Sequence, residues 1–157
     1  PDIASAVPIY EAFARLNLTK TILGVSLAHT LVSLPYVIYI AMGVFETIPR
    51  DLEEQAYVLG AGKFYSFVHV VLPVAAPGLA AGAIYTFLLS WNEFIFAYFL
   101  LWGGRDTLPA FLQRSLFEAP PENLLMTIAV LLTIPVIIFT FATQKYMKMG
   151  MTAGAVK

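Results

Sequence analysis

Three long apolar runs constrain the fold of this chain more than any other feature of its sequence. Residues 22–45 and 124–143 contain no Asp, Glu, Lys or Arg, and residues 74–101 contain a single charged side chain, Glu93. A bilayer core about 30 Å thick is crossed by roughly 20 helical residues, so each run is long enough to span a membrane. We therefore predict an all-α fold, a polytopic bundle of transmembrane helices with three full spans.

The overall composition agrees with a membrane protein. Only 12% of the residues are charged and 59% are apolar, whereas about a quarter of the residues in a soluble domain are charged. The net charge of −1 gives no reason to expect a nucleic-acid partner. The sequence has no cysteine, which excludes disulfides and thiolate metal sites. The expected location is the cell (inner or plasma) membrane, crossed several times, with membrane lipid as a partner.

The runs divide the chain into a simple order. Residues 1–157 are expected to form one transmembrane domain, in which residues 1–21 are the end of an earlier span plus a connector. Residues 46–73 form a polar loop between two spans, and residues 144–157 form a short basic tail. Because the sequence begins with Pro1 rather than Met, we expect it to be a fragment whose N-terminal part is missing.

The loop 46–73 carries several helix signals. Asp51 is predicted to cap a first short helix, with Glu54 three residues later reaching back as in a capping box. Gly60 suits a left-handed helix end. A second short helix is expected to follow, and Pro73 and Pro77 are expected to frame the entry to the next span. The pattern predicts two short helices that bend at Gly60 and lie along the membrane surface.

The first of these helices has a narrow apolar stripe formed by Leu52, Ala56 and Leu59, which recur at helical spacing. Glu53 and Glu54 flank the stripe. One interpretation is an ordinary interfacial connector. The other is a docking element that enters a groove with basic residues at its rim, on a soluble partner protein.

Glu93 is the one charged residue deep inside a predicted span. A charge at that depth costs about 2.5–3.5 kcal/mol on insertion scales, and such residues usually face a cavity or a partner. Glu93 is therefore either a lining residue of a substrate pathway, together with Ser90 and Asn92, or part of a structural hydrogen bond or ion pair. His29, alone in its span, is expected to be hydrogen-bonded within the helix bundle.

Catalytic chemistry has no signature in this sequence. The spacing of its polar residues supports no metal cluster and no pair of nucleophile and base. We predict no catalytic residue, no metal and no cofactor, and therefore no enzyme. The phosphate-binding pattern G-x-x-x-x-G-K-S/T is also absent, so any ATP is expected to be bound by another chain.

The loop also resembles the EAA segment of ATP-binding-cassette (ABC) importer permeases. Glu54 takes the position of the glutamate, Ala56 that of the second alanine, and Gly60 that of the glycine. Gln55 replaces the first alanine, and Leu59 replaces an acidic residue that is common before the glycine. The resemblance implies that this coupling helix docks on the ATP-hydrolysing subunit through Glu53, Glu54, Gln55, Ala56, Leu59, Gly60 and Ala61.

Two further stretches resemble the carbohydrate-uptake group of these permeases, which includes the maltose type. Residues 90–94 read S-W-N-E-F, and residues 150–157 read G-M-T-A-G-A-V-K. The resemblance implies that the tail reaches the interface of the ATPase subunits through Thr152, Ala153 and Gly154. It also implies that the sequence begins near the end of the third of six helices.

The resemblance implies a function as well. It describes a permease subunit that moves a sugar or related polyol inward, with energy from ATP hydrolysed by a partner subunit. The implied partners are a dimer of ABC ATPase subunits, a second permease subunit in a heterodimer and an extracytoplasmic substrate-binding protein. The loop 46–73 and the tail would face the cytoplasm. The alternative is an ion- or proton-coupled secondary transporter in which Glu93 carries the proton.

Overall fold

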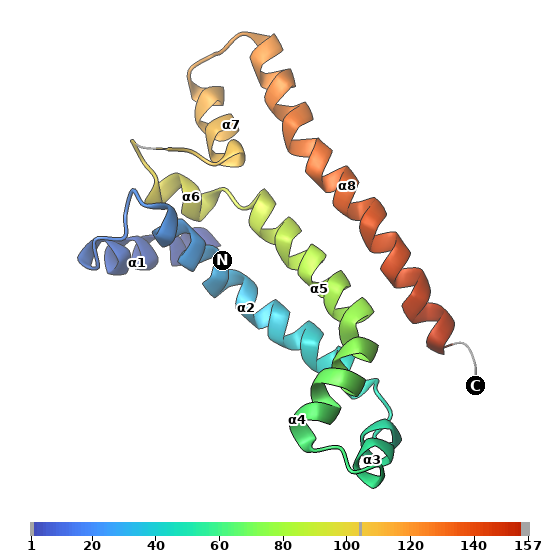
Figure 1. Cartoon of the computed structure of the whole chain (residues 1–157). Coiled ribbons are helices and arrows are strands. Elements are labelled where there is room, and N and C mark those ends of the chain that lie inside the picture. Colours follow the sequence, from blue (N-terminus) through green and yellow to red (C-terminus); the bar gives the residue numbers. More distant parts are fainter. Residues whose placement is uncertain (1, 104, 155–157) are drawn as a thin grey trace. The chain divides into compact units, whose positions relative to one another are not determined.

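The computed structural model describes residues 2–103 and 105–154, with the side chains of residues 3–103 and 105–142. These residues form helices and loops, and none of them lies in a strand (Figure 1). The elements are α1 (Asp2–Arg15), α2 (Ile22–Glu46), α3 (Asp51–Val58), α4 (Lys63–Ser66), the π-helical turn η1 (Phe67–Val71), α5 (Leu72–Asn92), α6 (Ile95–Leu100), α7 (Leu108–Phe117) and α8 (Glu122–Gly154).

Three helical stretches are long and apolar enough to cross a membrane. They are Ile22–Glu46, Lys63–Asn92 and Glu122–Ala142, which confirms the predicted all-α fold with three spans. No more than 11% of the residues in the most apolar window of each stretch are buried. Their apolar side chains therefore need lipid or further helices around them.

The middle span is shorter than its apolar run predicts. The run 74–101 was expected to form one helix, but α5 ends at Asn92 and a separate helix, α6, begins at Ile95. The backbone turns aside at Phe94, where φ is −128°. Hydropathy does not detect this break, because the residues on both sides of it are equally apolar.

The start of the middle span also differs from the prediction. A second short helix separate from the next span was expected, but α4 continues through η1 into α5 without interruption. Pro73 has no backbone N–H, and its ring would collide with the carbonyl one turn earlier in a regular α-helix. The wider π turn directly before it accommodates this proline within a continuous helix.

The chain divides into two compact units. The first comprises Pro1–Leu34 and Phe87–Ile138. In it α1 packs against α6, and the backbone N–H of Lys20 donates to the carbonyl of Leu100 at 2.7 Å. The core is built from alanine, branched aliphatic and phenylalanine side chains: Ala6, Phe13, Val25, Ala28, Phe96, Ala97, Leu100, Leu101 and Ala110.

The second unit comprises Pro35–Thr86 and Phe139–Lys157. In it α3 packs against α4 and η1, and Figure 1 shows α3 and α4 beyond the ends of α2 and α5. The two spans approach closely at Gly78, where an added Cβ would lie 2.7 Å from Cγ2 of Val44. A larger residue at position 78 would force these helices apart, which is why a small residue suits this position.

Candidate functional site

The helix α3 begins without the predicted side-chain cap. Arg50 is the N-cap residue, it has helical angles (φ −61°, ψ −28°), and no side chain caps the helix. Asp51 lies inside the first turn, so the prediction that it caps the helix is wrong. Its charge still favours this end, because Asp51, Glu53 and Glu54 all lie in the first turn, next to the positive end of the helix dipole.

The end of α3 is a Schellman motif centred on Gly60. Gly60 has a φ of +86°, as its predicted left-handed conformation requires. Its N–H donates to the carbonyl of Tyr57 at 2.9 Å, and the N–H of Ala61 donates to that of Ala56 at 3.0 Å. These two bonds satisfy carbonyls that the end of a helix leaves free. A side chain at position 60 would cost about 1–2 kcal/mol in this conformation.

The predicted apolar stripe is split between the inside and the surface. Ala56 is buried and Leu52 is half-buried, so this part of the stripe serves the packing of α3. Leu59 is 87% exposed. Three apolar residues that the stripe did not include are also exposed, namely Val58 at 87%, Phe64 at 81% and Tyr65 at 57%. We call Val58, Leu59, Phe64 and Tyr65 the apolar tip.

The remaining docking candidates differ in exposure. Glu54, Gln55 and Gly60 are exposed, whereas Glu53 and Ala61 are half-buried. The Tyr57 hydroxyl donates to Oε1 of Glu53 at 3.5 Å. Slight desolvation and, after it, the nearby Glu53 carboxylate raise the pKa of the exposed Tyr57 phenol above its ordinary value. The phenol therefore keeps its proton at neutral pH and remains a donor.

The tail residues Thr152, Ala153 and Gly154 lie at the end of α8. Their side chains are outside the described part of the chain, as is the structure of residues 155–157. Their contact with an ATPase therefore remains a prediction.

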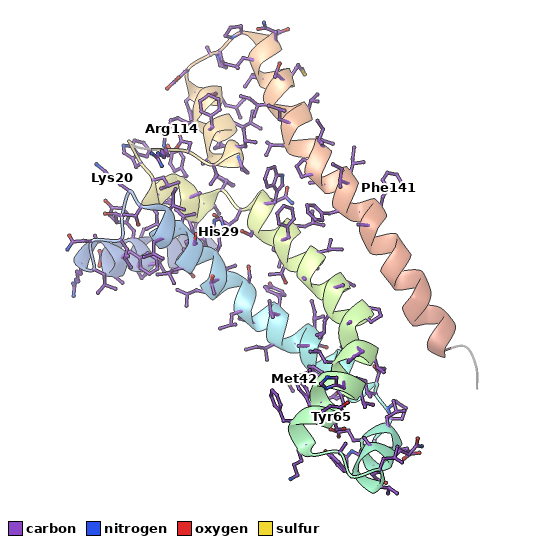
Figure 2. All side chains as sticks on the ribbon, viewed as in Figure 1. Lys20, His29, Met42, Tyr65, Arg114 and Phe141 are labelled. Atoms are coloured by element: carbon purple, nitrogen blue, oxygen red, sulfur yellow. The ribbon has the colours of Figure 1, made fainter. Side chains whose placement is uncertain are left out.

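Glu93 lies at the break between α5 and α6 and joins three elements. Its Oε1 accepts the N–H of Phe96 at 2.9 Å, and its Oε2 accepts the N–H of Ala97 at 3.2 Å. These are two of the N–H groups that the start of α6 leaves unpaired. Oε2 also lies 2.9 Å from Nε2 of His29 on α2. Figure 2 shows His29 on α2, beside this break.

His29 is bonded through both ring nitrogens, as its place inside a span predicts. Its Nδ1 lies 2.8 Å from the hydroxyl oxygen of Ser90 on α5. With the ring proton on Nε2, the histidine donates to Glu93 and accepts from the Ser90 hydroxyl. His29, Ser90 and Glu93 thus form one hydrogen-bonded group, here called the Glu93 cluster, which ties α2 to both sides of the helix break.

The structure brings together two of the three pathway candidates. Ser90 and Glu93 meet in the Glu93 cluster, whereas the amide of Asn92 is exposed and donates to the carbonyl of Leu88 in its own helix at 2.8 Å. Sequence reasoning found each polar residue but not their pairing. The sequence did contain a signal for this pairing. A histidine in one apolar run and a carboxylate in another are both costly in lipid unless they bond to each other.

Sequence reasoning missed a second polar group, which lies around α7. Nη1 of Arg114 lies 2.8 Å from Oδ2 of Asp106. The same guanidinium lies over the rings of Tyr98 and Trp102, at 5.6 and 5.4 Å from their centroids. The loop before α7 is thereby attached to the end of α6. Thr107 begins α7, because its hydroxyl accepts the N–H of Ala110 at 3.4 Å.

Replacing Arg114 with alanine is expected to lower the free energy of unfolding by about 1–3 kcal/mol, because it leaves the Asp106 carboxylate unpaired. That carboxylate is only 11% exposed. Thermal unfolding of the full-length subunit in detergent measures the effect, with the exposed Arg15→Ala as the matched control. Asp106→Ala in the Arg114→Ala background should restore part of the loss. Equal melting points for Arg114→Ala and Arg15→Ala would contradict this prediction.

Residues 2–152 match the protein family described as "Binding-protein-dependent transport system inner membrane component". The whole chain is 35% identical to a putative ABC transporter permease protein of Streptomyces antibioticus, and it covers 69% of that protein. It is 34% identical to the trehalose transport system permease protein SugB of Mycobacterium tuberculosis, over the whole chain and 59% of that protein. Over 88% of the chain it is 38% identical to the alpha-glucoside transport system permease protein AglG of Rhizobium meliloti, and it covers 37% of that relative.

The chain therefore belongs to the family of binding-protein-dependent transport system inner membrane components. This membership confirms the resemblance found at the EAA segment and agrees with the three membrane-spanning helices. The protein is an inner-membrane component of the ABC permease class. The chain spans only part of the length of these relatives, 37–69% of each.

Proposed function

We propose that this chain is part of the permease subunit of an ABC importer that moves a sugar or related polyol inward. Family membership supports this proposal, as do the names of relatives, which refer to trehalose, alpha-glucoside and trehalose/maltose transport systems. The subunit itself is not catalytic in this proposal. A dimer of ATP-hydrolysing subunits supplies the energy, an extracytoplasmic binding protein delivers the substrate, and a second permease subunit completes a heterodimer.

The observation that carries the coupling role is the exposed apolar tip next to the acidic first turn of α3. Val58, Leu59 and Phe64 are each more than four-fifths exposed, although apolar side chains of this size gain free energy when they are buried. Val58 and Leu59 lie between the stretches Ile22–Glu46 and Lys63–Asn92, and Phe64 lies at the very start of the second of these. A soluble partner with an apolar groove and basic residues at its rim would cover them and pair with Glu53 and Glu54.

The connection between α4 and the middle span supports a mechanism. Because α3 packs against α4 and η1, and α4, η1 and α5 are one continuous helix, a displacement of α3 is passed on to the middle span. Closure of the ATPase pair with bound ATP would move the docked α3 and tilt the attached spans. The pathway would then change from inward-open to outward-open, provided that the ATP-bound pair has a different geometry.

The pathway and tail residues are part of the same proposal. Ser90, Asn92 and Glu93 are proposed to lie along the substrate pathway, and Thr152, Ala153 and Gly154 to contact the ATPase dimer. If Glu93 contacts substrate, Glu93→Gln should impair uptake of some substrates more than others. The proton-carrier alternative is less favoured, because both oxygens of Glu93 already accept hydrogen bonds.

Uptake assays distinguish the importer from a secondary transporter. The full-length subunit is reconstituted in proteoliposomes with its co-purifying subunits and the binding protein, and uptake of labelled trehalose and methyl α-glucoside is measured. We expect uptake that requires hydrolysable ATP and is unchanged by a protonophore. Uptake that continues without ATP and collapses with the protonophore would instead make Glu93 the proton carrier.

A further inference from the structure

A cavity of about 480 Å³ opens beside the Glu93 cluster, entirely within the first unit. This volume is within the range of small-molecule sites, about 300–1,000 Å³. The start of α2, the end of α5 and the loop before α7 form its walls. Neither Glu93 nor Asn92 lines it. Its lining includes Ser26, His29, Ser90, Trp91, Arg105 and Asp106.

One wall of the cavity is aromatic and held in place. The indole N–H of Trp91 donates to the carbonyl of Leu132 on α8 at 3.1 Å. The Trp91 ring is also stacked with that of Phe87, at 5.8 Å between centroids and 22° between planes. Both rings line the cavity. Since the N–H of Trp91 is already used, the ring offers the cavity an apolar surface rather than a donor.

The polar residues that line the cavity are Ser26, Ser90 and Thr107 with hydroxyls, His29 with an imidazole, and the charged Arg105 and Asp106. Ser26 contributes a hydroxyl from α2, and Ser90 contributes one from α5. The Ser90 hydroxyl that donates to His29 keeps lone pairs with which to accept a further hydrogen bond. Glu93 fixes this arrangement by holding the opposite nitrogen of His29. Glu93 is thus a positioning residue for the cavity and does not itself line it.

The charges around the cavity favour a neutral ligand. The Asp106 carboxylate is paired with Arg114 at 2.8 Å, and His29 is bonded to Glu93. Arg105 is exposed. A buried ionic ligand would need an opposite charge that is not already compensated, and neither ion pair supplies one. Oδ1 of Asp106 accepts no hydrogen bond among the described residues, although Oδ2 of the same carboxylate is paired with Arg114. A rigid aromatic surface opposite several hydroxyl-bonding groups instead suits a ring or chain that has C–H groups on one face and hydroxyls at its edge.

We infer that this cavity is a subsite for a neutral polyhydroxylated solute, a saccharide ring or a polyol, stacked on Trp91 and hydrogen-bonded by Ser26 and Ser90. The inference rests on the proposed function and moves the ligand contacts of this chain from Asn92 and Glu93 to Ser26, Ser90 and Trp91. It also assigns the Glu93 cluster to holding the polar wall in place.

Fluorine NMR tests ligand binding directly. The full-length subunit in its assembled transporter is labelled with 5-fluorotryptophan, and the Trp91 and Trp102 resonances are assigned from Trp91→Phe and Trp102→Phe. The probes are trehalose, maltose, methyl α-glucoside and glycerol, with glucose 6-phosphate as an anionic comparison. Titration extends to about 10 mM, above the usual upper end of KM values near 1 mM.

We expect a saturable shift of the Trp91 resonance with at least one neutral probe, while Trp102, which does not line this cavity, stays constant. A Trp91 resonance that none of the neutral probes moves would overturn the inference. A shift with glucose 6-phosphate alone would also overturn it, because the site would then be anionic.

A pair of variants separates stacking from a structural role of Trp91. Trp91→Phe and Trp91→Leu both lose the N–H bond to Leu132, but only Trp91→Phe keeps a flat ring. We expect the KM for uptake to rise at least about tenfold more in Trp91→Leu than in Trp91→Phe, whereas Trp102→Phe leaves it unchanged. Equal losses in the two Trp91 variants would mean that the ring only supports the fold.

The two proposals fail in different ways. Suppose that uptake of a neutral sugar is driven by ATP, but the Trp91 resonance does not shift and the two Trp91 variants lose activity equally. The importer proposal would then stand, and the subsite inference would be wrong. If the wild-type transporter shows no ATP-dependent uptake, the importer proposal is wrong. The NMR titration would still decide whether the cavity binds these solutes.

Discussion

Replacing Glu93 with alanine is expected to lower the free energy of unfolding by about 2–4 kcal/mol. The change removes the acceptor of three donors at once, the N–H groups of Phe96 and Ala97 and the imidazole of His29. A part-buried donor that loses its partner costs about 1–3 kcal/mol in general, and hydrogen bonds in membranes average nearer 0.6 kcal/mol. Thermal unfolding of the full-length subunit in detergent measures the loss.

Two control variants make this result interpretable. Glu118 is an exposed glutamate at the end of α7, so Glu118→Ala removes the same side chain without the hydrogen bonds and should change stability by less than about 0.5 kcal/mol. Glu93→Gln keeps one oxygen as an acceptor and should fall between wild type and Glu93→Ala. If Glu93→Ala has the same melting temperature as Glu118→Ala, the hydrogen bonds of Glu93 do not stabilise the break between α5 and α6.

Replacing Leu59 with glutamate is expected to abolish coupling to the ATPase while leaving the subunit folded. Leu59 is 87% exposed, so the change costs little in the free subunit. In the proposed complex it would place a charge in an apolar groove, beside the acidic first turn of α3, and a residue at the centre of an interface commonly accounts for 2 kcal/mol or more of binding. Recovery of the ATPase with the tagged full-length subunit should fall about 30-fold or more.

The matched control for the docking test is Phe117→Glu. Phe117 is 77% exposed and lies at the end of α7 in the first unit, whereas the apolar tip belongs to the second unit. This variant should recover the ATPase like wild type. Undiminished recovery with Leu59→Glu, at an unchanged melting temperature, would mean that the apolar tip is not the docking surface and that the loop is an ordinary interfacial connector.

The sequence by itself determined the features that depend on local chemistry. Long runs with at most one charged residue specified the three spans, because each charge placed in lipid is costly. Gly60 specified a left-handed helix end, because other residues are strained there. The spacing from Glu54 to Gly60 pointed to the family that the comparison of residues 2–152 then established.

Only the tertiary structure decided which residues meet. The apolar run 74–101 has no hydropathy signal for a break, because the break depends on a carboxylate that bonds to His29 far away in the chain. In the same way, the helical period placed Leu52, Ala56 and Leu59 on one stripe, but the packing of α3 buried Ala56 and exposed Leu59. Pairing and burial depend on distances between segments, whereas sequence patterns report only the order of residues along one segment.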